Sequence, residues 1–376
     1  MAAALAMGAN LIVMKQTLQR CMRRQQVALL TSACLLLTAN LVLADSRTFG
    51  LVVVGLGGNN DYREMFEEAA SVTIDAINPP AIATTPASST QEDADDSQVG
   101  GLRLLLENEA NREAILAEIE TQVELANQQP ETSRFMLILF GHGNYDGEHY
   151  RFNTRGADIT ASEIREALQP LQTPRQFLLF ATSASGAVLD IFEHTAEDQS
   201  ESSEAGDNNL QRIVVTATKS GAEANAVQFP RYWSEVLAGQ LADTDHNELL
   251  TVMEAYKAAS DGVARHYDNR QLLATEHSRV VVDNEGSMVL ARLGSLRGQE
   301  NNIEVNRLLD QRQQLEVEFN RVRATRDSRL QSEYLDELEQ VLLNIANLQL
   351  RIDKATGWQP DGSIESGPGN GGQSGG

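Results

Sequence analysis

Short, almost wholly apolar runs alternate with amphipathic stretches from residue 48 to about residue 290. Runs of this length and composition are typical of strands that are buried on both faces of a sheet. The predicted strands are residues 49–54, 102–106, 135–140, 177–181 and 213–217, with 280–282 as one further strand. The predicted helices are residues 62–77, 111–127, 161–168, 186–192, 231–241 and 249–267. This alternation predicts an α/β domain at residues 45–294, with a mainly parallel sheet and helices on both of its faces.

A different pattern begins after about residue 294, because residues 300–354 contain no Gly or Pro and many helix formers. Apolar residues recur there at intervals of three and four, on each side of an arginine-rich break at 323–329. The upstream seam consists of Leu308, Leu315, Phe319 and Val322, and the downstream seam of Leu338, Val341, Ile345, Leu348 and Ile352. Pairing the seams hides both from water, so we expect an antiparallel, coiled-coil-like helical hairpin at residues 295–356 that contacts a protein partner. One long interrupted helix is the alternative, and residues 357–376 have the Gly/Ser-rich composition of a disordered tail.

The first 44 residues have the pattern of an export signal. Positively charged residues from Lys15 to Arg24 precede an almost wholly apolar stretch at 27–44, whose last residues suit signal cleavage before Asp45. The stretch is close to the lower limit for spanning a bilayer, so an uncleaved signal anchor is the alternative. We therefore expect an exported protein, periplasmic or extracellular, that meets a membrane only through this segment.

Charge and cysteine content narrow the possible functions. The formal net charge is -23 at pH 7, which repels phosphate backbones and argues against nucleic-acid binding. The only cysteines, Cys21 and Cys34, lie inside the export segment. Removal of that segment would leave no disulfide, no cysteine nucleophile and no thiolate metal ligand.

Candidate chemistry gathers at the ends of three predicted strands. His142 follows one strand and lies between Gly141 and Gly143, and a hydroxyl-rich turn that includes Ser183 follows the next strand. The third strand leads into a loop that contains Thr218 and Glu223. Because functional groups in open α/β sheets gather at the carboxyl ends of strands, we expect His142 and Ser183 to lie side by side if their strands are neighbours.

The ordered set of strand ends resembles the legumain family of cysteine peptidases, within the wider caspase-like group. In that resemblance His142 and Gly143 match the His-Gly pair, Ser183 stands where the nucleophilic cysteine is expected, and Thr218 and Glu223 match residues near the specificity pocket. The resemblance implies a caspase-like fold for residues 48–290, peptide or protein partners and no cofactor.

The serine at position 183 decides the functional expectation. A serine hydroxyl loses its proton far less readily than a thiol and usually needs a base that a third group holds in place. The sequence carries no signature for that third group. We therefore expect a catalytically inactive pseudopeptidase that recognises peptides or proteins or serves as a scaffold. The alternative is an active hydrolase in which His142 is the general base for Ser183.

An acidic stretch matches part of a calcium-binding loop. The candidate ligands at its first, third, fifth and twelfth positions are Asp243, Asp245, Asn247 and Glu254. Glu248 occupies the sixth position, where glycine normally makes the turn. We therefore favour a capping role for Asp245 or Asn247 at the helix expected from residue 249 over a calcium site.

Overall fold

The computed structural model describes residues 47–78, 101–192, 210–239, 242–283, 288–299, 302–326 and 329–358. The predicted export segment at 1–44 and the tail beyond residue 358 lie outside the described residues. Within the described ranges, no helix has both the length and the apolar character that a membrane span requires.

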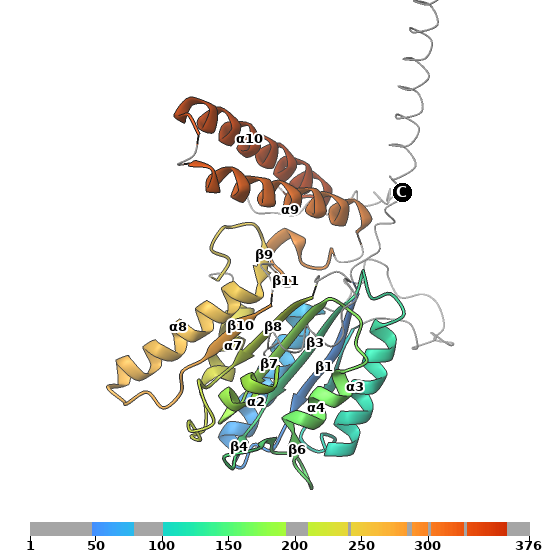
Figure 1. Ribbon diagram of the computed structural model, residues 1–376, viewed down its shortest axis with the longest axis vertical. Coiled ribbons are helices and arrows are strands. Elements are labelled where there is room, and N and C mark those ends of the chain that lie inside the picture. Colours follow the sequence, from blue (N-terminus) through green and yellow to red (C-terminus); the bar gives the residue numbers. More distant parts are fainter. Residues whose placement is uncertain are drawn as a thin grey trace, which may run out of the picture. The chain divides into compact units, whose positions relative to one another are not determined.

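A six-stranded sheet forms the centre of the α/β domain, in the order β10-β8-β7-β3-β1-β2 (Figure 1). Its strands are β1 (Thr48–Val54), β2 (Leu102–Leu105), β3 (Arg134–Phe140), β7 (Arg175–Ala181), β8 (Gln211–Thr216) and β10 (Arg279–Val282). All neighbours pair in parallel except β10, which is antiparallel to β8. The sequence-based prediction of a mainly parallel sheet is therefore confirmed.

Helices cover both faces of this sheet. The buried strands carry apolar side chains on both faces, so each face needs a layer of helices to keep it from water. Val52 of β1 packs in one core cluster and Leu51 and Val53 pack in the other. The first cluster contains residues of α2 (Asn60–Ile77), α7 (Phe229–Ala238) and α8 (Val252–Arg270). The second contains residues of α3 (Arg112–Ala126), α4 (Ala161–Leu168) and α5 (Leu189–Phe192), the last preceded by the 3-10 turn η1 (Ser185–Val188).

The strand order reverses direction beside β1. The chain passes from β1 to β2 on one side, and then returns to place β3 on the other side of β1. In open α/β sheets the loops that follow the two strands at such a switch point diverge, and ligands bind where they part. The loops after β1 and β3 meet this condition, and the second of them carries His142.

Several short strands were not predicted. A three-stranded antiparallel sheet follows β3, consisting of β4 (Gly143–Tyr145), β5 (Tyr150–Phe152) and β6 (Ile159–Thr160). A second pair joins β9 (Leu249–Thr251) to β11 (Val289–Arg292). These strands are two to four residues long, too short to show a periodic pattern in the sequence.

The start of α8 corrects one prediction. Residues 249–251 form β9, so the helix begins at Val252 rather than at residue 249. Its cap is Thr251, whose hydroxyl accepts a hydrogen bond from the Glu254 N–H while the Glu254 carboxylate accepts one from the Thr251 N–H. This capping box leaves neither Asp245 nor Asn247 as the cap of α8.

The C-terminal helices α9 (Ile303–Ala324) and α10 (Gln331–Thr356) form the predicted antiparallel hairpin. Arg312 near the middle of α9 bonds Gln349 near the end of α10, and Arg321 near the end of α9 pairs with Glu337 near the start of α10. Leu308 and Leu348 pack in one cluster with Leu296, which belongs to the 3-10 turn η2 (Gly294–Leu296) that joins the hairpin to the α/β domain.

One ion pair between helices makes stability depend on pH. The Arg112 guanidinium bonds Glu163 and holds the pKa of that carboxyl down at about 2, although partial burial acts in the opposite direction. A lowered pKa means that the stabilisation is complete above the ordinary value of 4.5 and is lost as the pH falls towards 2. We expect Glu163→Gln to lower the free energy of unfolding by about 1 kcal/mol at pH 7 and by less than half as much at pH 3. Urea unfolding at both pH values measures the difference. Glu113→Gln is the matched control, since Glu113 is exposed and only approaches Arg112 at 3.8 Å.

Candidate active site

His142 and Ser183 follow neighbouring parallel strands at the same level. Phe140, the last residue of β3, is paired with Ala181, the last residue of β7. His142 and Ser183 each lie two residues beyond these partners. The expectation that the two strands are neighbours is therefore confirmed, and both residues lie at the carboxyl edge of the sheet.

The His142 ring is held between the loop after β1 and helix α2. Its Nε2 lies 3.1 Å from the carbonyl oxygen of Gly57, and its ring meets Tyr62 and Phe66 edge-on at centroid distances of 5.2 and 5.4 Å. A carbonyl oxygen can only accept, so Nε2 is the nitrogen that carries the proton in the neutral ring. Nδ1 is then the unprotonated nitrogen, which is the atom that could act as a base.

The turns that carry His142 and Ser183 touch each other through backbone. A Cβ atom at Gly143 would lie 2.7 Å from the Ser183 carbonyl oxygen and 2.7 Å from the Tyr150 hydroxyl oxygen. Contacts this close leave room only for glycine. Gly143 therefore permits the close approach of the two strand ends.

The turn after β7 carries three hydroxyl groups in different environments. The Thr182 hydroxyl lies 2.5 Å from the buried Tyr150 hydroxyl, and burial raises the pKa of Tyr150. The Ser185 hydroxyl lies 3.3 Å from that of Thr218. Ser183 is only 2% exposed, and within the described part of the chain its hydroxyl makes no hydrogen bond. Ser183 is thus the one hydroxyl of the three that is not used to hold the turn together.

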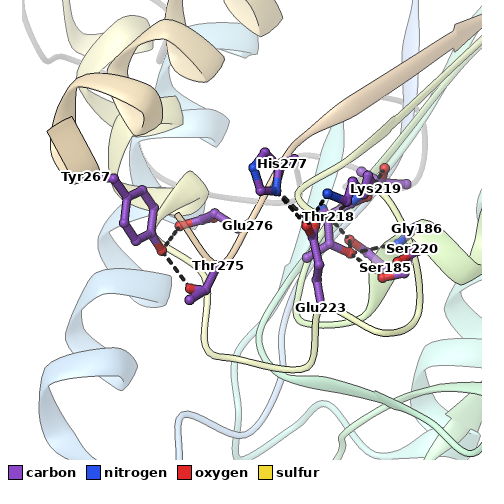
Figure 2. Close-up of polar contacts among 11 residues, drawn as sticks. Ser185, Gly186, Thr218, Lys219, Ser220, Glu223, Tyr267, Thr275, Glu276 and His277 are labelled. Atoms are coloured by element: carbon purple, nitrogen blue, oxygen red, sulfur yellow. Dashed lines mark hydrogen bonds and ion pairs between the residues drawn. The ribbon is translucent and has the colours of Figure 1, made fainter. Parts of the chain in front are cut away.

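Backbone contacts fix the turn after β7 against the loop after β8 (Figure 2). Ala184 adopts a left-handed conformation with φ of 54°, and its N–H donates to the Glu223 carbonyl oxygen at 2.8 Å. The Gly186 N–H donates to the Thr218 hydroxyl at 2.9 Å, and a Cβ at Gly186 would lie 2.1 Å from the Ser220 nitrogen. A left-handed alanine is strained and persists only where its surroundings hold it, so this turn has one fixed shape.

The Glu223 side chain is engaged within the protein. Its carboxylate accepts hydrogen bonds from the Lys219 N–H at 2.9 Å and from the His277 N–H at 3.1 Å, and it lies 2.5 Å from His277 Nδ1 (Figure 2). Burial acts to raise the pKa of Glu223, but these hydrogen bonds outweigh it and the pKa is lowered. Glu223 is therefore a carboxylate at neutral pH, and it connects the loop after β8 to the segment before β10.

Glu276, the residue before His277, holds the start of helix α7 in place. Glu276 is 3% exposed, and its carboxylate accepts hydrogen bonds from the N–H groups of Gln228 and Phe229 at the start of α7 and from the Tyr267 hydroxyl. Figure 2 shows the Tyr267 side chain pointing toward Glu276, the residue that precedes His277 in the chain. Burial raises the pKa of Glu276. The acid also offsets the positive end of the α7 dipole, which has no side-chain cap of its own.

The acidic loop at 243–248 gathers three carboxylates. One oxygen from each of Asp243, Asp245 and Glu254 lies within 4.8 Å of the others, so these groups could hold a metal ion. The same carboxylates already accept hydrogen bonds: Asp243 from the N–H groups of Asn247 and Glu248, and Glu254 from Thr244 and Thr251. These hydrogen bonds hold the loop in a tight turn.

Arg312 of α9 supplies a positive charge beside this loop. Its side chain is 2% exposed and donates to the Asn247 carbonyl oxygen at 2.9 Å, and its Nε lies 3.4 Å from Glu316. Burial lowers the pKa of Arg312, and the charges of Glu316 and the loop carboxylates oppose that effect. The hairpin is therefore in direct contact with the acidic loop.

Sequence reasoning found the strand ends but missed their partners. The group that orients His142 is the backbone carbonyl of Gly57, and a carbonyl leaves no signature in a sequence. His277 lies 54 residues from Glu223, so no spacing connects them. Tyr150 is the first residue of β5, a short strand that the apolar pattern does not reveal.

No family model matches this chain, and a search of curated proteins gives no match either.

Crowding of the acidic loop gives a test of the calcium alternative. Burial raises the pKa of Asp245, and the neighbouring Asp243 and Glu254 raise it further. A raised pKa means that ionisation of Asp245 costs stability as the pH rises through that pKa. We expect Asp245→Asn to leave the free energy of unfolding at pH 7 unchanged or to increase it by less than about 1 kcal/mol, because solvent screens this exposed group.

Calcium titration followed by thermal unfolding separates the two roles of the loop. We expect millimolar calcium to leave the melting temperature of the wild-type protein nearly unchanged. A large calcium-dependent rise that disappears in Asp245→Asn would show instead that the loop is a cation site.

Proposed function

We propose that this protein is an exported, catalytically inactive relative of the legumain-like peptidases, and that it recognises a peptide or protein. The proposal rests on the resemblance of the three strand ends to that family and on the environment of Ser183. The arrangement of the strand ends supports it, because the loop of His142 lies at the switch point of the sheet, where α/β proteins bind ligands, and the turn of Ser183 touches that loop.

The observation that carries the inactive assignment is the isolation of the Ser183 hydroxyl. A catalytic serine needs a base within hydrogen-bond reach to take its proton. Among the described residues, neither His142 nor any other side chain bonds this hydroxyl, and the residue is 2% exposed. A substrate carbonyl would have to reach an almost buried oxygen that no base activates.

Peptide recognition is supported by the edge of the sheet beside the site. Of the described strands, β10 is the outermost on this side, and it begins two residues after His277. An outer strand offers backbone N–H and C=O groups to an extended peptide, which adds to the sheet as a further strand. The Glu223–His277 pair at the start of β10 would then lie beside the bound peptide and select among side chains.

A second candidate function is an active hydrolase that uses Ser183. One observation favours it: Gly57 holds His142 with Nε2 protonated, which leaves Nδ1 as a base. The hydrogen bond between a nucleophile and its base is often long in the absence of substrate. The orientation of His142, rather than a short hydrogen bond to Ser183, is therefore the feature that an active enzyme would need.

Reactivity at position 183 distinguishes the two candidates. We expect the wild-type protein to resist a serine-reactive covalent probe and to hydrolyse no peptide. In a Cys21→Ser, Cys34→Ser background, we expect Ser183→Cys to react with a thiol alkylator at a similar rate with and without His142→Ala, because no side chain of the described residues bonds the Ser183 hydroxyl. A rate at least about tenfold faster with His142 present would show that the imidazole favours the thiolate and would support the hydrolase. Mass spectrometry of the labelled residue measures both reactions.

Ser185→Cys is the matched control, since Ser185 lies in the same turn but is fully buried against Thr218. We expect no alkylation of this variant. Labelling of the wild-type protein by the serine probe, lost in both Ser183→Ala and His142→Ala, would establish the hydrolase instead.

Export is the part of the proposal that depends on residues 1–44. We expect intact-mass analysis of the protein recovered from cells to give Asp45 as its first residue, because the small Ala44 suits the signal peptidase. Ala44→Arg should block this cleavage. A wild-type protein that keeps its apolar segment and sediments with membranes would show an anchor in place of a cleaved signal.

A further inference from the structure

Helix α10 carries two apolar stripes, of which α9 covers only one. The covered stripe includes Val341, Leu348 and Ile352, which are at most 5% exposed. The second stripe lies roughly a third of a turn away around the helix and lines an open groove. The groove is lined by Leu335, Leu338, Leu342, Leu343 and Ala346, and Leu350 extends the stripe beyond it towards the end of α10.

The second stripe is exposed in the single chain. Leu335 and Leu342 are 48% and 47% exposed, and Leu343 and Leu350 are 52% and 66% exposed. A leucine-rich stripe in contact with water is costly, and exposed patches of this kind mark association surfaces. If α9 were its only neighbour, α10 would need one apolar stripe, but α10 carries two.

The spacing of the stripe is symmetric about its midpoint. Leu335 lies seven residues before Leu342, and Leu350 lies seven residues after Leu343. If two copies of α10 lie antiparallel with the two-fold axis between residues 342 and 343, Leu335 faces Leu350 of the other copy and Leu342 faces Leu343. A self-complementary patch of this kind is what a two-fold interface between identical chains requires.

The distribution of charge along α10 also favours an antiparallel pair. Its first half carries Glu333 and Asp336, and its last turns carry Arg351 and Lys354. The antiparallel arrangement brings the acidic half of each copy beside the basic end of the other, within about one helical turn. A parallel arrangement would instead place like charges opposite each other, which disfavours it.

Glu339 is the charged residue that lines the groove, and its position also fits the symmetry. It lies three residues before Leu342, and Ala346 lies three residues after Leu343. The antiparallel contact therefore places Glu339 against Ala346 of the other copy. The small alanine side chain leaves space for the carboxylate to extend into solvent.

We infer that the occupant of this stripe is a second copy of this chain, and that the two hairpins associate through antiparallel α10 helices. This interface is separate from the strand-end site, so the protein presents that site twice in one assembly. The proposed dimer does not depend on the peptidase resemblance.

Disruption at the two-fold axis tests the interface. Sedimentation equilibrium of the purified chain should give the mass of two copies, and Leu342→Glu with Leu343→Glu should raise the dimer dissociation constant at least about a hundredfold. These residues are about half exposed in the single chain, so the variant should keep its helical circular-dichroism spectrum. Val317→Glu is the matched control, because Val317 is 66% exposed on α9 and lies outside the stripe. A wild-type mass of one copy, as expected if another segment of the same chain covers the stripe, overturns the proposal.

Cysteine pairs test the antiparallel orientation. In a Cys21→Ser, Cys34→Ser background, Glu339→Cys with Ala346→Cys should form a disulfide-linked dimer on mild oxidation in cells. Each single variant should form little, because the antiparallel register places position 339 opposite position 346 and not opposite itself. Efficient cross-linking of the single variants would indicate parallel helices and refute the arrangement, as would a wild-type dimer whose double-cysteine variant does not cross-link.

Discussion

The parallel register of β3 with β7 is the constraint on which the candidate site depends. It brings the ends of two strands to one level, and the loops beyond them are then close enough to touch. Gly143 allows that contact because no side chain separates it from the Ser183 carbonyl. A shift of the register by one residue would turn every side chain of β7 to the opposite face and would separate the two turns.

Around this constraint the site is held mainly by backbone groups. The Gly57 carbonyl orients His142, the Glu223 carbonyl accepts from Ala184, and the Gly186 N–H reaches Thr218. Such a frame tolerates replacement of the side chain at its centre, since the Ser183 hydroxyl contributes no hydrogen bond to the described structure and only the Ser183 backbone carbonyl accepts one. The geometry of the site can therefore be retained after the catalytic activity has been lost.

The long elements were predictable from the sequence because burial on two faces demands continuous apolar runs, as in β1, β3 and β7. The helical hairpin was predictable because its two seams need each other. Short strands such as β5 and β9 were not, because two or three residues carry no period. The boundary at α8 was readable, since Thr251 and Glu254 have the capping-box spacing, but the acidic residues before it offered a competing cap. Within the site, contacts through backbone carbonyls and between distant residues left no pattern to read.

Arg312 joins the hairpin to a loop that precedes it by 65 residues in the chain. The residues Asp243 and Asp245 are therefore synthesised before the guanidinium that compensates their charge. Because domains form from the N-terminal end as the chain emerges, this loop can reach its final charge balance only when α9 arrives. The α/β domain can therefore complete the last step of its folding only after the C-terminal hairpin has been synthesised.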